Sequence, residues 1–353
     1  MDASTVNQVV GMDLGDKYSV LCTLDEAGEI FEESRIRTTS AGVAARFEHL
    51  SACRVVLEAG THSPWVSRQI ESYGHEVIVA NPRRVALIYG DHTKSDEIDA
   101  RTLAKLGRMD PELLSPIRHR GAETLAHRAV LTARTAMVRS RARLIQVARG
   151  ITKSHGQRLP SCGANGFAGK VKDKIPAELA PALIPLVEII DDLTRRIRVQ
   201  DREIERICEE TYPDTALLRQ IGGVGAVTAL RFVLTLEDPY RFTSSRSVAS
   251  YLGLRPRRSQ SGGSDPQMRI TKAGDREMRR LLVQSAHYIL GPFGKDCDLR
   301  RFGERLAARG GKSGKKRAVV AVARKLAVLL HRLWVTGETY EPLRNGNKMK
   351  IAA

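Results

Sequence analysis

The chain has 353 residues and is strongly basic, with 57 lysines and arginines, 40 aspartates and glutamates and a formal net charge of +17. No apolar run approaches the roughly 20 residues needed to cross a bilayer, and no signal peptide is recognisable, so we expect a cytoplasmic, bacterial-type protein with no membrane partner. The five cysteines form no C-x-x-C pair, which argues against zinc ribbons and disulfide frameworks.

The charge is segregated along the chain. Residues 1–100 carry 9 basic and 16 acidic side chains, and residues 176–240 carry 7 and 12. In contrast, residues 101–175 carry 16 basic and 4 acidic side chains, and residues 241–353 carry 25 basic and 8 acidic side chains. An acidic module joined to basic regions suits a polyanionic partner such as a nucleic acid, whereas the alternative is a generic solubility surface.

Residues 8–105 alternate strand and helix patterns. Short apolar or alternating runs predict strands at 9–12, 19–24, 30–37, 55–58 and 76–80, and helical spacing predicts helices at 43–50 and 64–73. Strands that come first, followed later by a crossover helix, predict a mixed sheet with helices on its faces.

Four carboxylates stand at the ends of these elements. Asp13 ends the first strand and Glu58 ends the fourth, while Asp96 and Asp99 open a helical pattern and share one helix face. Gathered carboxylates repel one another unless a cation compensates them, and the hard cations Mg²⁺ and Mn²⁺ prefer oxygen ligands. The pattern predicts the metal site of an RNase H-like nuclease core, in which the metal polarises a phosphodiester or activates its attacker.

The middle of the chain has a different pattern. Residues 121–150 and 186–207 repeat apolar side chains at heptad spacing, and a Gly/Lys/Pro-rich stretch at 151–182 joins them. Two such helices predict an antiparallel coiled-coil arm for dimerisation, with Arg134 and Arg141 as candidate nucleic-acid contacts. An ordinary helical hairpin within one monomer is the alternative.

Residues 214–353 predict a separate, mostly helical, basic domain. Residues 218–229 contain an apolar-Gly-x-apolar-Gly turn between two helices, which is typical of a helix-hairpin-helix element. The exposed amides that follow such a turn bind phosphate, so Gly223 and Gly225 are candidate contacts. A plain corner that needs glycine for packing is the alternative.

The segment 255–281 combines basic residues with a Gly/Ser loop. Ser261 stands beside two glycines, where a hydroxyl can approach a phosphate and nearby cations can stabilise its alkoxide. From local sequence alone, however, a serine in such a loop is more often a turn residue than a nucleophile. The candidate nucleic-acid contacts of this domain are Arg255, Arg257, Arg258, Lys272, Arg276, Arg279, Arg280, Lys312, Lys315 and Lys316.

Residues 310–313 look like the end of a P-loop. Leu306 occupies the position of that motif's leading glycine, so we reject an ATP site there.

Ordered motifs extend over nearly the whole chain, at 11–15, 57–61, 81–82, 94–101, 221–225, 251–256, 261–263, 270–274 and 324–326. Through them the chain resembles the DEDD-type transposases of the insertion sequence 110 family, which are bridge-RNA-guided serine recombinases. One departure follows Glu58: residues 62–65 read His-Ser-Pro-Trp, where relatives often carry a tyrosine.

The resemblance implies a RuvC-like domain whose metal ligands are Asp13, Glu58, Asp96 and Asp99. It also implies a catalytic serine that matches Ser261, with Ser259 and Ser264 as weaker candidates. Donor and target DNA would be specified by a noncoding bridge-type RNA. The site would lie within one chain or across a homo-oligomer, either a dimer or a tetramer.

We therefore predict an α/β RNase H-like (RuvC-like) domain at residues 1–118, a coiled-coil arm and linker at 119–212, a mostly α-helical transposase domain at 213–340 and a tail at 341–353. Attack by Ser261 would form a phosphoserine link that conserves bond energy, so a DNA 3′-hydroxyl can displace the serine without ATP.

Three alternatives differ in class. A structure-selective nuclease, such as a Holliday-junction resolvase, would use the same acids with water as the attacker. An actin-like or sugar-kinase-like ATPase is suggested by residues 11–16, although we find no second phosphate loop. A non-catalytic nucleic-acid scaffold would not need the acids.

Overall fold

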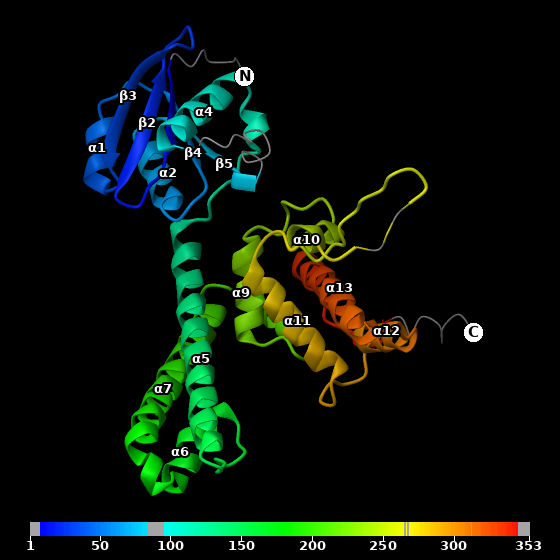
Figure 1. Ribbon diagram of the computed structural model, residues 1–353. Helices are drawn as coiled ribbons and strands as arrows, with labels where there is room; N and C mark the ends of the chain where they lie inside the picture. The colour runs from blue at the N-terminus through cyan, green and yellow to red at the C-terminus, as the bar shows by residue number, and fades with distance from the viewer. Residues whose placement is uncertain (1–7, 84–94, 265, 267, 312, 345–353) are drawn as a thin grey trace. The chain divides into compact units, whose positions relative to one another are not determined.

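The computed structural model describes residues 8–83, 95–264, 266, 268–311 and 313–344. The chain forms two compact units, Met1–Gly121 and Ala122–Ala353 (Figure 1). No helix in the described part of the chain is long and apolar enough to pass through a membrane.

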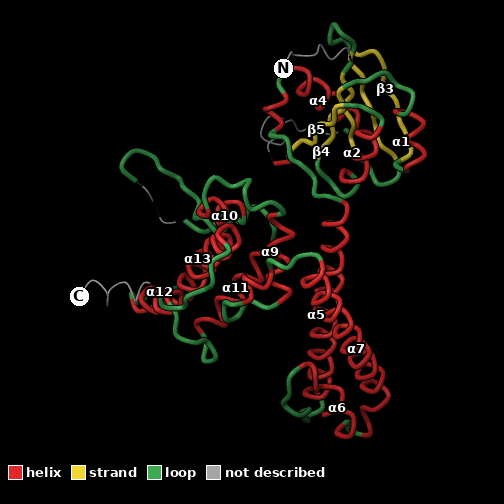
Figure 2. The backbone as a smooth tube through the Cα atoms, turned by 180° about the vertical axis from the view of Figure 1, so that it is seen from behind, coloured by secondary structure: helices red, strands yellow, loops and turns green. Residues whose placement is uncertain are grey.

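The first unit contains one five-stranded sheet in the order β3-β2-β1-β4-β5, drawn in yellow in Figure 2. Its strands are β1 (Val9–Asp13), β2 (Tyr18–Leu24), β3 (Ile30–Arg37), β4 (Arg54–Glu58) and β5 (Glu76–Ala80). β2 pairs antiparallel with β1 and β3, whereas β1, β4 and β5 run parallel. The mixed sheet predicted from the sequence is confirmed.

Helices cover both faces of this sheet. They are α1 (Ser40–Phe47) and α2 (Ser63–Ser72) on one face and α4 (Asp96–Met109) on the other. Because successive side chains of a strand point to opposite faces, β1 serves both layers. Val10 and Met12 pack among the side chains of α1 and α2, while Val9 packs with Leu103 of α4.

Helix α1 begins three residues before the predicted start at residue 43. Thr39 has an extended backbone, and its hydroxyl accepts a hydrogen bond from the Gly42 amide at 3.1 Å. This N-cap satisfies one of the first free amides of the helix, so the helix begins before its apolar face does.

Helix α4 crosses β1 in direct backbone contact. A Cβ atom added to Gly11 would lie 2.0 Å from the Ala100 carbonyl oxygen and 2.4 Å from the Ala104 amide nitrogen. No side chain fits in that space, so this layer can pack closely only because residue 11 is glycine.

The second unit begins with two long helices, α5 (Ala122–Ser154) and α7 (Ala180–Glu210), which pack side by side (Figure 1). The short helix α6 (Phe167–Val171) lies between them in sequence and shares an apolar cluster with both. Both predicted helices are confirmed, and their supercoiling stays a prediction.

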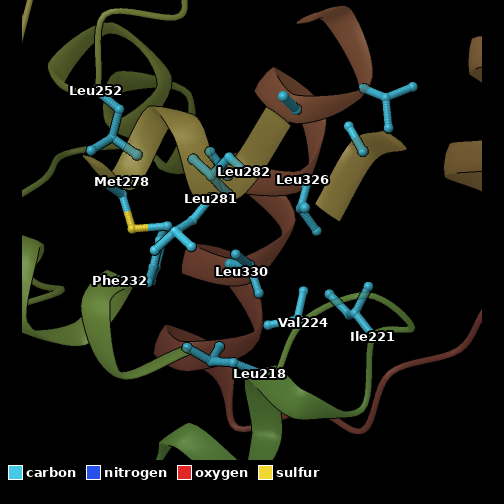
Figure 3. Close-up of a cluster of buried hydrophobic side chains, with 14 of the residues drawn as sticks. Leu218, Ile221, Val224, Phe232, Leu252, Met278, Leu281, Leu282, Leu326 and Leu330 are labelled. Carbon is cyan, nitrogen blue, oxygen red and sulfur yellow. The ribbon is translucent and has the colours of Figure 1, made fainter. Parts of the chain in front are cut away.

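The rest of the second unit is helical. It comprises α8 (Thr215–Arg219), α9 (Ala226–Leu236), α10 (Ser245–Tyr251), α11 (Arg276–Leu290), α12 (Asp298–Ala308) and α13 (Gly314–Thr336). Figure 3 shows the core, where Leu326 and Leu330 of α13 face Leu282 and Phe232. Trp334 packs near Phe232 and donates its indole hydrogen to Asp214, as expected for a structural side chain.

We expect Gly11→Ala to destabilise the first unit by about 2 kcal/mol, because the added methyl group must push α4 away from the sheet. Urea unfolding followed by tryptophan fluorescence in a Trp334→Phe background reports this unit through Trp65. Gly60→Ala is the matched control, since a Cβ there meets nothing within 4 Å. Equal midpoints for the two variants would contradict the close approach.

Candidate functional site

Two of the predicted acids end neighbouring parallel strands. The register pairs Met12 of β1 with Leu57 of β4, and the next residues are Asp13 and Glu58. Both acids are half-buried. The sheet therefore places them next to each other at its carboxyl-terminal edge, where open α/β sheets bind ligands.

The direction of α4 brings the other two acids to the same edge. Arg54 at the start of β4 donates a hydrogen bond to the Gly107 carbonyl near the end of α4, at 3.1 Å. Ala100, nearer the start of the helix, lies against Gly11. The helix thus runs antiparallel to β1 and β4, so its N-terminus lies at the edge that carries Asp13 and Glu58.

Asp96 and Asp99 occupy the first turn of α4. Ser95 caps this end, where its hydroxyl accepts a hydrogen bond from the Ile98 amide at 3.3 Å. Asp96 is exposed and Asp99 is half-buried. The partial positive charge of the helix N-terminus offsets part of their mutual repulsion.

The topology brings the four carboxylates to one edge but not into a closed cluster. Across the described residues, no three His, Cys, Asp or Glu side chains are close enough to hold a metal ion. Asp13, Glu58 and Asp99 each interact with neighbouring groups. The donor set of four carboxylates at one sheet edge still fits a hard divalent cation chemically.

A histidine follows Glu58 in the turn before α2. The Trp65 indole donates to His62 Nδ1 at 3.2 Å, which leaves the proton on Nε2, and Nε2 is 3.5 Å from Asp16 Oδ1. The sequence marked His62 only as part of a departure from relatives, and it did not predict the contacts of this side chain with Asp16 and Trp65.

The bridges between Pro256 and Ile270 and between Ser261 and Ser264 put Ser261 at the far end of a hairpin-like excursion between α10 and α11. Figure 1 draws this excursion in yellow. Ser261 and Ser264 exchange backbone hydrogen bonds of 3.2 and 3.1 Å, and between them Gly262 has a φ of +56°, which glycine adopts without strain. Nearer the base, the Arg257 amide donates to the Arg269 carbonyl at 2.9 Å. The Ser261 side chain is therefore exposed and displayed by a tight turn.

Two family models match this chain. Residues 10–155 match "DEDD_Tnp_IS110: Transposase", and residues 215–293 match "Transposase IS116/IS110/IS902 family", so together the matches cover more than half of the chain. The chain belongs to the IS110/IS116 transposase family. A transposase of this family cuts and rejoins DNA, and its DEDD domain implies dependence on divalent metal in general.

Relatives match over most of their length. The transposase for insertion sequence element IS1111A of Coxiella burnetii is 26% identical over 94% of this chain and 91% of its own. The transposase for insertion sequence element IS1328 of Yersinia enterocolitica is 27% identical over 80% and 84%. The pilin gene-inverting protein of Moraxella bovis is 25% identical over 81% of each chain.

Most of the predicted basic contacts of the transposase are exposed. They are Arg255, Arg257, Arg258, Lys272, Arg276, Arg280, Lys315 and Lys316, whereas Lys312 lies outside the described residues. Gly223 and Gly225 lie in the turn between α8 and α9, where Gly225 is the N-cap residue of α9. The assignment of this turn as a helix-hairpin-helix element stays a prediction.

Arg279 makes hydrogen bonds within the chain that the sequence did not predict. Its guanidinium is half-buried and donates to the carbonyls of Leu252, at 3.2 Å, and Ala273. These bonds fasten the two ends of the serine-bearing excursion to α11. The structure therefore gives Arg279 a role in holding the base of the hairpin, and a phosphate contact by this side chain stays a prediction.

Of the two predicted contacts on the arm, Arg141 differs from the prediction, and the contact by Arg134 stays a prediction. Arg141 is 7% exposed and donates to Asn165 at 2.9 Å and Thr194 at 3.2 Å, so its guanidinium lies inside the helical hairpin. Burial, with a smaller effect of the nearby Arg134, lowers its pKa. Arg134 itself forms an ion pair with Asp201 of α7 at 2.5 Å. In this structure both arginines join α5 to its neighbours, and Arg141 is inaccessible to a nucleic acid.

Asp275 holds the end of the serine-bearing excursion at the start of α11. It caps α11 by accepting a hydrogen bond from the Met278 amide at 2.8 Å, and it forms ion pairs with Arg128 of α5 at 2.6 Å and Arg231 of α9 at 2.8 Å. Burial alone would raise the pKa of Asp275, but the two guanidinium groups and the amide outweigh it and hold the pKa at about 2. One carboxylate thus joins three helices.

We expect Asp275→Asn to destabilise the second unit by about 3 kcal/mol, because asparagine keeps the cap but leaves two arginines short of their anion. The pKa of Asp275 in the folded protein lies below the ordinary value of 3.8. The contribution of its carboxylate to the free energy of unfolding is therefore complete above about pH 5 and is lost as the pH falls toward 2.

Urea unfolding at several pH values in a Trp65→Phe background, in which Trp334 is the reporter, measures this contribution. The exposed pair of Asp192 and Arg196 supplies the control, Asp192→Asn, which should change little. A stability difference between wild type and Asp275→Asn that persists unchanged at pH 2 would contradict the assignment.

Proposed function

We propose that the protein is a transposase or site-specific recombinase that uses Ser261 as its nucleophile. The observation that carries this proposal is the exposed Ser261 hydroxyl on a glycine turn, with cationic side chains around its base. The four carboxylates Asp13, Glu58, Asp96 and Asp99 would hold Mg²⁺ or Mn²⁺. A cation bound there would polarise the phosphodiester and favour the alkoxide form of the serine.

The chemistry is an exchange of phosphodiesters. Ser261 Oγ loses its proton and bonds to phosphorus, the P–O3′ bond of the DNA breaks, and the departing 3′-oxygen takes up a proton. A 3′-hydroxyl from a second strand then attacks the phosphoserine, forms a new phosphodiester and returns the serine hydroxyl. Each step exchanges one phosphate ester for another, so no nucleotide hydrolysis is required.

An element-encoded RNA would specify donor and target DNA by base pairing. The protein then needs contacts to backbones more than to base edges, which suits many exposed arginines and an aromatic content of only 5%. Because its substrate is DNA, the enzyme would act in the bacterial cytoplasm, at the nucleoid.

We infer a homo-oligomer, a dimer or tetramer, formed through the arm. Large apolar side chains are exposed on the outside of the helical hairpin, at Val147, Ile184, Ile189 and Val199. Their burial against a second copy would remove apolar surface from water and favour association.

Replacing the nucleophile separates this mechanism from a resolvase that uses water. Ser261→Ala should lower DNA cleavage and strand transfer by about 10³-fold or more, with unchanged thermal stability, because the proposed covalent link forms on the Ser261 hydroxyl. Ser259→Ala, in the same loop, is the matched control and should retain activity. Mass spectrometry of trapped complexes should find DNA on the peptide that contains Ser261. Full cleavage by Ser261→Ala would favour the resolvase.

Removing one acid tests the metal site. Asp13→Asn should abolish cleavage while DNA binding is kept or tightened, because the loss of a negative charge weakens repulsion of phosphates. Asp16→Asn, three residues away on an exposed side chain, is the control. Cleavage assayed across Mg²⁺ and Mn²⁺ concentrations measures both variants, and full cleavage by Asp13→Asn would contradict the assignment of Asp13 to the metal site.

A further inference from the structure

A basic cavity of about 930 Å³ lies in the second unit, apart from the serine turn. It is lined by α10, α12, α13 and residues 339–344. Among its described lining residues, arginines and lysines outnumber acids eight to two, the acids being Asp298 and Glu341. A concave surface with this charge imbalance concentrates anions.

The cations come from regularly spaced positions on the helices. Arg324 and Arg332 of α13 are two turns apart on one face, and Arg301 and Arg305 of α12 are one turn apart. Arg246 projects from the start of α10. Three helices thus contribute basic side chains to one space, and its apolar floor includes Leu299 and Leu333 of the core cluster.

Much of this charge is not neutralised within the chain. Arg301 forms an ion pair with Asp296 at 2.6 Å, and Arg332 with Glu338 at 3.0 Å. Four lining arginines have no acidic partner among the described residues: Arg246, Arg255, Arg305 and Arg324. Like charges around one cavity raise the free energy of the folded chain, and a bound polyanion would relieve that repulsion.

A second cavity, of about 390 Å³, adjoins the first at the base of the serine-bearing excursion. Both cavities are lined by Arg255 and Arg324, and the second adds Arg257 and Arg258. Arg257 is the residue whose amide pairs with Arg269 on the opposite arm of the hairpin. The basic surface therefore extends from α12 to the hairpin that carries Ser261.

We propose that these two cavities form a binding groove for the phosphodiester backbone of one nucleic-acid strand and guide it toward Ser261. The groove offers guanidinium groups to phosphates, and the ring of Phe302 in its lining is covered by Lys325 of the same chain. Because contacts to phosphates carry no sequence information, we expect binding in the groove to be independent of base sequence. Its role as a route to Ser261 rests on the proposed function, whereas its affinity for phosphates does not.

Salt dependence of binding tests the groove on the full-length protein. Arg305→Gln combined with Arg324→Gln should reduce the slope of log K against log salt by about 1.4 for a single strand, which is about 0.7 per lost phosphate contact. Affinity at physiological salt should fall on the order of tenfold. Fluorescence anisotropy with oligodeoxythymidine, oligouridine and duplex DNA as separate probes identifies which nucleic acid occupies the groove.

A control variant that loses the same charge separates the effect of the groove on binding from the effect of the net charge of the protein. Arg309→Gln, at the end of α12, combined with Arg195→Gln on α7 removes two exposed arginines that do not line either cavity. This variant should keep the wild-type slope. Equal slopes for groove and control variants with all three probes would overturn the proposal, and a loss with any probe supports it.

Two further variants keep the outcome interpretable. Arg246→Gln with Arg305→Gln repeats the test from a different helix if the first pair lowers thermal stability. Ser261→Ala should bind every probe with the wild-type slope, because it leaves the groove intact. Failure of the serine mechanism and failure of the groove therefore give different results.

Discussion

The contact between α4 and β1 at Gly11 is the constraint on which the first unit depends. Backbone atoms of Ala100 and Ala104 occupy the space of a side chain at residue 11, so the helix lies directly on the strand. Small residues continue along this face of α4 to Gly107, where an added Cβ would lie 2.3 Å from the Val56 side chain, so the helix stays close to the sheet along its length. Asp96 and Asp99, in the turn that leads to Ala100, are thereby held at the edge of the sheet where Asp13 and Glu58 lie.

A different interaction organises the second unit. Asp275 receives hydrogen bonds and charge from α5, α9 and its own helix, and Arg279 ties Leu252 and Ala273 to the next turn of α11. The long excursion between α10 and α11 therefore begins and ends on a rigid base. The serine turn is far from this base along the chain and has few bonds of its own. The base of the segment is therefore held in place, and its tip is exposed.

Local patterns predicted the sheet, the helices and the sheet-edge position of the acids, because period-2 and helical spacing depend only on neighbouring residues. Local patterns did not predict which arginines are buried. Arg141 falls inside the hairpin because Asn165 and Thr194, distant in sequence, accept its hydrogen bonds. The basic groove was missed for the same reason: Arg246, Arg305 and Arg324 come from three helices, and no single segment shows them as a group.

The turn from Ser261 to Ser264 has few contacts with the rest of the chain, which affects when the proposed reaction can begin. Two backbone hydrogen bonds close it, and no atom lies within 4 Å of a Cβ built on either glycine. If Ser261 is the nucleophile, as proposed, aligning its hydroxyl for in-line attack would cost conformational entropy that bound substrate would have to offset. Under the proposed mechanism, the enzyme would stay idle until its substrate is bound, which would limit stray breaks in the host chromosome.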